Sequence, residues 1–318
     1  MRYALAPMEG VTGHVFRQAH AACFGPADKY LTPFLSPNQN LCFTSRERAE
    51  VLPEHNDGLN VVPQLLTSNA AHFLWASREL AAMGYREVNL NLGCPSGTVV
   101  AKGKGSGLLG RREELERLLD GIYARAGIPV SIKTRLGLRD PEEFFPLLEL
   151  FNRYPVCELI IHPRVQKDFY RHQPRLDAFA AALASCRAPV CYNGDLVTAA
   201  DCAALIRRFP GVTALMAGRG AVADPALFSK ARGGPGADRG ALRAFHDELY
   251  AGYAQAFGSR RNATLRMKEF WSYLLGLFQD GAGQAKALRK AADPAAYEAA
   301  VNHIFQSLPL REDAAVIW

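Results

Sequence analysis

The chain has 318 residues, of which 49% are hydrophobic and 21% are charged, with a formal net charge of +6 and a pI of about 9.0. This is the composition of a folded globular protein, and no apolar run approaches the length needed to span a bilayer. The positive charge is compatible with a polyanionic partner but does not identify one.

Cysteine spacing and the amino terminus indicate the cellular compartment. The seven cysteines, at positions 23, 42, 94, 157, 186, 191 and 202, form neither a CxxC pair nor a Cys/His metal-binding spacing. An odd number of cysteines at these spacings is typical of reduced thiols and argues against structural zinc, so we expect no metal. The first residues lack the pattern of a secretory signal, and we therefore expect a cytoplasmic protein.

Apolar stretches alternate with helical stretches through the first two thirds of the chain. Eight stretches have strand composition: 3–7, 29–35, 60–65, 87–91, 130–134, 157–162, 189–193 and 212–217. Helical period is found between them, at residues 70–83, 111–126, 141–153, 176–185 and 198–208. Each strand ends in a polar or glycine signal, as in a barrel whose active site lies at the carboxyl ends of the strands. The sequence therefore predicts an α/β fold, a (β/α)8 TIM barrel over residues 1–232.

The composition changes after the eighth unit. Residues 233–240 are rich in glycine and include a proline, which is typical of a linker. Beyond it, residues 242–257, 265–277, 284–292 and 295–308 have helical composition with short polar breaks. We predict a small all-helical C-terminal domain over residues 241–318.

The strand at 87–91 leads directly into Gly93-Cys94-Pro95, which places a thiol at its carboxyl end. Ligands bind at that end of parallel strands, so the position favours a chemical role. A buried cysteine that only fills space is the alternative. No acyl-transfer motif or nearby histidine supports a nucleophile, whereas donating a proton to a carbon atom requires only reach and a suitable pKa.

Other strand ends carry possible ligand contacts. Glycines follow the last two strands, at residues 193–195 (Asn-Gly-Asp) and 218–220 (Gly-Arg-Gly), where barrels commonly bind phosphate through backbone N–H groups. Lys133 and His162 also stand at strand ends, where a cation and an imidazole can contact an anionic ligand. A surface lysine and a structural histidine are the alternatives.

The tail has a basic and aromatic segment at residues 260–271. Its helical spacing allows a charged face over an apolar one, as in a helix that follows an RNA backbone. A solvated charged face over a packed tryptophan is the alternative. The basic residues are Arg260, Arg261, Arg266 and Lys268.

Taken together, seven segments resemble the tRNA-dihydrouridine synthases, and their combination in this order is specific. They are Ala6-Pro7-Met8-Glu9-Gly10, Gln64, Asn91-Leu92-Gly93-Cys94-Pro95, Lys133-Thr134-Arg135-Leu136-Gly137, His162 with Arg164, Asn193-Gly194-Asp195 and Gly218-Arg219-Gly220. The resemblance implies an FMN-dependent barrel that reduces the 5,6 double bond of uridine in tRNA. It also implies NADPH or NADH as electron donor and a helical domain that helps to hold the RNA.

By the same resemblance, Cys94 is the proton donor. The positions that fall on flavin contacts are Pro7, Met8, Glu9, Gln64, Lys133, His162, Asn193, Gly194, Asp195, Gly218 and Arg219. Together with the basic tail, the expected RNA contacts are Asn91, Lys102, Lys104, Arg164, Arg261, Arg266 and Lys268. The chain departs from the family at Pro163 and Val165, where Gly and Thr are common, and near Thr32-Pro33-Phe34, where a glutamate is expected.

Two other functions stay open at this point. One is a barrel flavin reductase that acts on a small pyrimidine or an enone and has a purely structural tail. The other is a non-catalytic RNA-binding protein that uses the barrel as a scaffold, which a purified protein without flavin would favour. The sequence specifies neither the modified uridine nor the oligomeric state.

Overall fold

The computed structural model describes residues 1–316 and divides into two compact units. Unit 1 contains Met1–Pro7, Lys29–Gly194 and Ile206–Met216. Unit 2 contains Met8–Asp28, Asp195–Leu205 and the described chain from Ala217 onward. The predicted domains, 1–232 and 241–318, stay a prediction, and the last two residues of the second lie outside the described part.

Unit 1 is built on a parallel sheet with strand order β3-β2-β1-β9-β8-β7-β6-β5-β4. The segments β3 and β4 are separated only by Pro63, and they pair with β2 and β5 respectively, so one stretch of chain joins both ends of the sheet. The sheet thus closes, and counting β3 and β4 as one strand gives the eight expected strands within residues 1–316. The strands are β1 (Arg2–Leu5), β2 (Lys29–Leu31), β3 (Val61–Val62), β4 (Gln64–Leu65), β5 (Val88–Leu92), β6 (Val130–Arg135), β7 (Leu159–His162), β8 (Val190–Asn193) and β9 (Ala214–Ala217).

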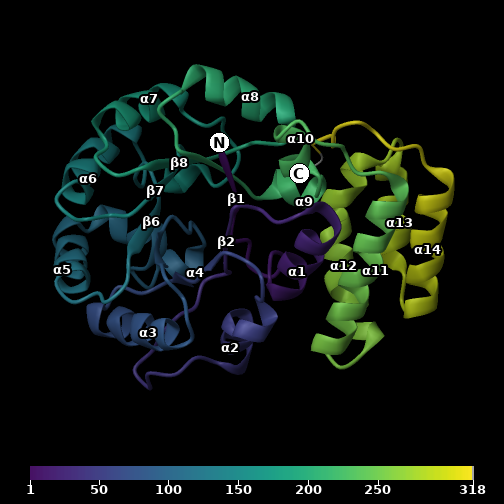
Figure 1. The fold of residues 1–318 in the computed structure, drawn as a ribbon, viewed down its shortest axis with the longest axis horizontal. Coiled ribbons are helices and arrows are strands. Elements are labelled where there is room, and N and C mark those ends of the chain that lie inside the picture. Colours follow the sequence, from purple (N-terminus) through teal and green to yellow (C-terminus); the bar gives the residue numbers. More distant parts are fainter. Residues whose placement is uncertain (317–318) are drawn as a thin grey trace. The chain divides into compact units, whose positions relative to one another are not determined.

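Amphipathic helices cover the strands of unit 1: α3 (Ala70–Ala82), α5 (Arg112–Tyr123), α6 (Phe144–Phe151) and α7 (Leu176–Ser185), as Figure 1 shows. In α5 the buried residues are Leu115, Leu118, Leu119 and Ile122, the spacing of one helical face. The predicted TIM barrel with a helical tail is confirmed.

The helix α2 (Ser45–Val51) of unit 1 was not predicted, although the sequence carries its signal. It begins after Thr44, whose hydroxyl accepts the N–H of Glu47 at 3.2 Å. The Glu47 carboxylate accepts the N–H of Thr44 in return, at 2.9 Å. Thr-x-x-Glu is a capping box, and it marks a helix start even where the apolar pattern is short.

Charged residues gather where the strands begin. The Lys29 ammonium lies 2.9 Å from the Glu87 carboxylate and 3.0 Å from that of Glu158, and Arg2 contacts Glu158 at 3.1 Å. Lys29 opens β2 and Arg2 opens β1, while the two glutamates precede β5 and β7. These ion pairs tie four strands together at the end of the barrel where strands start, which favours a role in stability.

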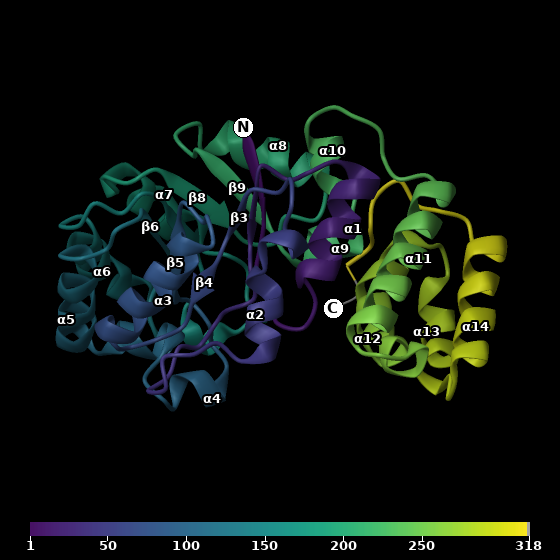
Figure 2. The same ribbon diagram turned by 60° about the horizontal axis from the view of Figure 1, so that its bottom comes forward.

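Unit 2 is helical. The helices α11, α12, α13 and α14 lie side by side in Figures 1 and 2, and they match the four helices expected in the tail. All four begin earlier than predicted, and three of them have a side-chain cap at the new start: Asp238 caps α11, Ser259 caps α12 and Asp293 caps α14. The helices of this unit are α1 (His14–Phe24), α9 (Arg219–Ala223), α10 (Leu227–Ala231), α11 (Arg239–Ala256), α12 (Arg260–Leu274), α13 (Gly281–Lys290) and α14 (Pro294–Ser307). A further helix, α8 (Ala199–Arg208), joins segments of the two units.

A directional hydrogen-bond chain crosses the core of unit 2. The indole N–H of Trp271 donates to the Tyr297 hydroxyl at 2.9 Å, and this hydroxyl lies 2.7 Å from Nε2 of His246. An indole only donates, so the tyrosine oxygen accepts this bond and its own hydrogen can be directed to His246, whose Nδ1 lies 2.8 Å from the Asp247 carboxylate. Burial lowers the pKa of His246, which favours its neutral form.

The helices of the structure were also compared with the length and hydropathy of a membrane span. No helix within residues 1–316 is long and apolar enough to cross a membrane.

Candidate active site

Alternation along the strands directs two predicted site residues into the barrel. Val62 of β3 and Ile160 of β7 belong to an apolar cluster of buried residues from six strands and their ends. Side chains two positions apart on a strand face the same way. Gln64 and His162 therefore point into the barrel beyond that cluster, toward the carboxyl ends of the strands.

Strand register brings three more predicted residues to the same face. Lys133 pairs with Ile160 across β6 and β7, and Asn91 pairs with Lys133 across β5 and β6. Asn193 pairs with Met216, which also belongs to the interior cluster. The structure thus brings five predicted residues together at one end of the barrel interior: Gln64, Asn91, Lys133, His162 and Asn193.

Asn91 holds the backbone that leads to Cys94. Its side-chain oxygen accepts the N–H groups of Gly93 at 3.0 Å and of Cys94 at 2.9 Å. A backbone N–H can only donate, so the amide orientation is fixed, and Asn91 Nδ2 donates to Oε1 of Gln64 at 2.7 Å. The residue predicted to contact RNA is therefore also the anchor of the cysteine loop.

The amide chain continues across neighbouring strands. Gln64 Nε2 donates to Oδ1 of Asn89 at 2.8 Å, and Asn89 Nδ2 donates to the Ser131 hydroxyl at 2.8 Å. Gln64 is 1% exposed, and Asn89 and Ser131 are fully buried. Each amide orientation follows from the one before it, so the chain forms a rigid polar layer inside the barrel.

The carbonyl side of Cys94 is held as firmly as its N–H side. Its oxygen accepts the backbone N–H of Ser106 at 3.1 Å and the Ser106 hydroxyl at 2.8 Å. Gly105 has φ of +56°, and a β-carbon there would lie 2.9 Å from the Cys94 oxygen, so this close approach requires glycine. The loop folds back onto Cys94 and leaves the residue partly exposed.

Lys133 is an unusual cation in the barrel. Burial lowers its pKa to about 8, and repulsion from the Arg135 guanidinium acts in the same direction. Its ammonium has no hydrogen-bond or ion-pair partner within residues 1–316. A desolvated cation of this kind stabilises a negative charge placed beside it, and such a charge would raise its pKa again.

Arg164 fixes the tautomer of His162. A guanidinium N–H can only donate, and Arg164 Nη1 lies 2.9 Å from His162 Nε2. Nε2 is therefore the acceptor, and the neutral imidazole carries its hydrogen on Nδ1. Arg164 is 2% exposed and also donates to the carbonyl of His172. An RNA contact by Arg164 stays a prediction; in this structure its guanidinium orients His162.

Arg135 connects two loops of the site. Its Nε donates to the Gly93 carbonyl at 3.0 Å, and its Nη1 donates to the carbonyls of Val165 at 3.0 Å and Phe169 at 2.9 Å. The residue is 1% exposed. Arg135 lies within one of the motifs that resemble the family but had no predicted role, and neither Ser106 nor Asn89 was a predicted site residue. The sequence signal for a role of Arg135 was its position at the end of a strand, two residues after Lys133.

Further predicted flavin contacts of unit 1 lie at strand ends. Pro7 follows β1 and is half-buried. Asn193 Nδ2 donates to the Met216 carbonyl at 2.9 Å. A β-carbon at Gly194 would lie 3.2 Å from the Tyr192 hydroxyl, so the chain is crowded there.

Unit 2 holds the turn after β1. Met8 N–H donates to the Thr12 hydroxyl at 2.8 Å, and the Met8 carbonyl accepts the Thr12 N–H at 3.0 Å. Gly10 has φ of +77°, and a β-carbon there would lie 2.6 Å from Nη1 of Arg266. The positive φ favours glycine in this turn, and the Arg266 side chain of α12 lies against it. Glu9 is exposed beside them.

The two glycine signals also meet within unit 2. Arg219 and Asp195 form an ion pair at 3.0 Å. A β-carbon at Gly220 would lie 1.9 Å from the Leu196 carbonyl oxygen, so the backbone of α9 packs directly on the loop after β8. Gly218 precedes the first residue of α9. Glycine at 220 therefore serves close backbone packing.

The predicted RNA-contacting cations differ in their surroundings. Lys102 and Lys104 follow α4 (Gly97–Val100) in the loop after Cys94, and burial together with the Lys102 charge lowers the pKa of Lys104. On α12, Arg261 is exposed and has no ion-pair or hydrogen-bond partner within residues 1–316. Lys268, in contrast, donates to the Ala291 carbonyl at 2.6 Å and so caps the end of α13.

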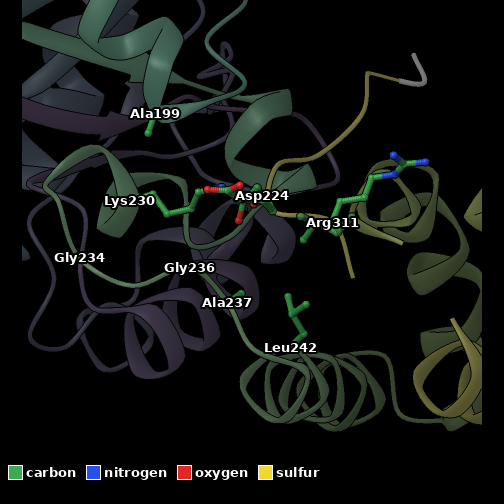
Figure 3. Close-up of a pocket in the computed structure, with 10 residues that line it drawn as sticks. Ala199, Asp224, Lys230, Gly234, Gly236, Ala237, Leu242 and Arg311 are labelled. Carbon is green, nitrogen blue, oxygen red and sulfur yellow. The ribbon is translucent and has the colours of Figure 1, made fainter. Parts of the chain in front are cut away.

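A pocket of about 330 Å³ lies within unit 2, lined by parts of α10, α11 and the C-terminal segment (Figure 3). It contains none of the predicted site residues. Lys230 points toward Asp224 at 3.0 Å and also contacts Asp313, so its charge is already neutralised. No cluster of three or more potential metal ligands is present within residues 1–316.

Comparison with known proteins agrees with this geometry. A family model described as dihydrouridine synthase (Dus) matches residues 4–303. A probable tRNA-dihydrouridine synthase of Staphylococcus epidermidis is 31% identical over 248 residues, covering 72% of this chain and 71% of that protein. One of Rhodobacter capsulatus is 31% identical over 238 residues, covering 71% and 72%. A morphinone reductase mutant in complex with tetrahydroNAD shares the fold, with a TM-score of 0.54, 12% identity and coverage of 77% and 90%.

Proposed function

The chain belongs to the dihydrouridine synthase family, and from this premise we propose that it reduces the 5,6 double bond of particular uridines in transfer RNA, with FMN as cofactor and NADPH or NADH as electron donor. The family resemblance noted in the sequence is confirmed. The observation that carries the proposal is the barrel interior. There Lys133, which has no partner in the described chain, and His162, whose tautomer is fixed, stand at the same strand ends as the Cys94 loop. A tRNA substrate also suits a cytoplasmic enzyme.

The residues present fit a flavin. Lys133 has a desolvated ammonium that stabilises negative charge on a ring, and His162 has a donor at Nδ1. Gly194 and Gly218 follow the last two strands of the barrel, which is where barrels commonly bind phosphate through backbone N–H groups. We therefore assign FMN contacts to Pro7, Met8, Glu9, Gln64, Lys133, His162, Asn193, Gly194, Asp195, Gly218 and Arg219.

The proton is the part of the reaction that the chain itself supplies. When bound, FMN provides a hydride to one carbon of the uracil double bond. Cys94 donates the proton to the other carbon, because its backbone is held by Asn91 on one side and Ser106 on the other while the residue stays partly exposed. A fixed general acid contributes roughly 10²- to 10⁴-fold to a rate.

The RNA is held by positive charge. Lys102 and Lys104 follow Cys94 in the chain, and Arg261 is an exposed cation without a partner in the described chain. Such cations bind phosphates and release counterions, so affinity falls with salt. We assign RNA contacts to Asn91, Lys102, Lys104, Arg164, Arg261, Arg266 and Lys268.

Mapping of dihydrouridine by mass spectrometry tests this function. Transfer RNA from cells that lack the protein should lose dihydrouridine at one or more positions. Wild-type protein should restore it, and a Cys94→Ala variant that retains flavin should not. An identical dihydrouridine map with and without the protein would contradict the proposal.

A further inference from the structure

Two adjacent aromatic residues, Phe169 and Tyr170, are exposed on the loop that follows β7. Their exposed fractions are 41% and 53%, and no other large aromatic side chain of unit 1 is as exposed among its described residues. The ring of Phe169 stacks on no other ring within residues 1–316. Neighbouring exposed aromatic side chains are typical of a surface that binds another molecule.

The backbone of Phe169 is held in a strained conformation. Its φ is +51°, a region that residues with a β-carbon rarely adopt. Its carbonyl accepts Nη1 of Arg135 at 2.9 Å, and its N–H donates to the Gln166 carbonyl at 3.2 Å. The buried Asp168 carboxylate accepts the Val165 N–H at 3.1 Å. The turn is therefore fixed by hydrogen bonds, and it displays the Phe169 ring instead of packing it.

The same guanidinium ties this turn to the catalytic loop. Arg135 Nε donates to the Gly93 carbonyl, one residue before the proposed proton donor. The Tyr170 ring centroid lies 5.3 Å from Cζ of Arg135 and 6.0 Å from the His162 ring centroid. Tyr170 thus borders the proposed uridine site, and Phe169 is its chain neighbour.

The surface around the turn is basic. Lys167, Arg171 and His172 are exposed on the same loop. The one acidic residue between positions 164 and 175, Asp168, is 1% exposed and pairs with Arg175. A positive surface with an exposed aromatic face is suited to single-stranded nucleic acid, because cations attract phosphates and the ring stacks on a base.

We propose that Phe169 is a stacking platform for an unpaired base of the tRNA that adjoins the uridine being reduced. This inference rests on the proposed function, since it requires RNA at the carboxyl ends of the strands. Stacking tolerates any base, so Phe169 contributes affinity and placement and not sequence preference.

Phe169→Gly is the informative variant, because glycine relieves the positive φ while it removes the ring. We expect unchanged flavin content, a thermal stability at least equal to wild type, and an affinity for unmodified tRNA lowered roughly tenfold. Phe169→Tyr should retain wild-type affinity. Leu41→Gly is a matched control in unit 1, because Leu41 is also exposed, at 45%, with φ of +47°. It should leave tRNA affinity unchanged.

Three results would overturn the stacking role. The first is a Phe169→Gly variant that binds tRNA as tightly as the wild-type protein does, while the wild-type protein binds and reduces tRNA. This result would remove the stacking role and leave the proposed function intact. Equal losses in Phe169→Gly and Leu41→Gly would show that no specific stacking occurs. If the wild-type protein itself neither binds nor reduces tRNA, both proposals fail.

A second variant keeps the test independent of how glycine affects folding. Phe169→Trp places an indole at the same position. The tryptophan emission that the variant has in excess of the wild-type protein should be quenched when tRNA binds, because a base stacks on the indole. Added fluorescence that tRNA does not change would contradict the stacking role.

Discussion

The side-chain oxygen of Asn91 lies 2.9 Å from the backbone nitrogen of Cys94 and accepts its hydrogen. The same oxygen accepts the Gly93 N–H, and the nitrogen of this amide donates to Gln64. One buried side chain therefore fixes where the thiol is presented and connects it to the polar layer inside the barrel.

We expect Asn91→Leu to destabilise the barrel and slow tRNA reduction. The leucine leaves two N–H groups and the Gln64 oxygen without partners, and each unsatisfied buried group costs about 1–3 kcal/mol. The free energy of unfolding, measured with denaturant, should fall by at least about 2 kcal/mol.

Asn91→Asp is the matched control. Its carboxylate still accepts both N–H groups, and the amides of Gln64 and Asn89 can invert so that Gln64 Nε2 donates to it. This variant should be clearly more stable than Asn91→Leu. Equal stabilities would show that the amide chain does not support the loop.

Lys133→Met should stabilise the flavin-free protein and weaken flavin binding. The folded pKa of about 8 lies below the ordinary 10.5, so the unfolded chain binds more protons between these values. Wild-type stability without flavin should therefore rise from pH 8 to 10.5, and the variant should lack that rise. Denaturant unfolding across this range, together with flavin content after purification, checks both expectations. Wild-type flavin content in Lys133→Met would contradict the assigned contact.

Unit 2 should lose stability in acid. Burial lowers the pKa of His20 from 6.5 to about 4, and it also lowers that of His246. The folded state binds fewer protons, so this stability is complete above about pH 6.5 and falls as pH drops toward 4. His20 alone accounts for about 2 kcal/mol by pH 5.

Unfolding by denaturant at pH 7.5 and pH 5 measures this loss. His20→Phe should reduce the difference between the two pH values, whereas the exposed His303→Gln should not. The same pH difference in His20→Phe as in wild type would assign the acid sensitivity to other groups.

The basic residues of α12 should separate into two kinds. Arg261→Gln should weaken tRNA binding and flatten its salt dependence without affecting stability, because this cation has no partner in the described chain. Lys268→Gln should lower thermal stability, because it removes the cap on α13. Binding isotherms at several salt concentrations and thermal melts compare them. An unchanged salt slope in Arg261→Gln would exclude this helix face from the RNA site.

The sequence predicted the barrel because each strand ended in its own polar or glycine signal. Lys133 and His162 could be placed at strand ends, with a surface lysine and a structural histidine as alternatives, and Gln64 was added by the family resemblance. The sequence could not predict that Arg164 sets the tautomer of His162, because that contact depends on the path of the loop after β7. The carbonyl contacts of Arg135 and Ser106 are likewise invisible in sequence, since backbone oxygens carry no sequence signal. Lys268 was predicted to contact RNA, which stays a prediction; that the fold also uses it as a helix cap could not be read from its pattern.

The most direct test of the account follows one turnover of the Cys94→Ala variant. Enzyme reduced with NADPH is mixed with unmodified tRNA, flavin reoxidation is followed by absorbance, and the RNA is analysed by mass spectrometry for two added hydrogens. The wild-type protein should produce dihydrouridine as its flavin is reoxidised. The variant should accept electrons from NADPH normally but form dihydrouridine at least about 10²-fold more slowly, the usual scale of a general acid. Dihydrouridine formation at the wild-type rate in Cys94→Ala would remove the thiol from the mechanism, and no dihydrouridine from the wild-type protein would contradict the central claim.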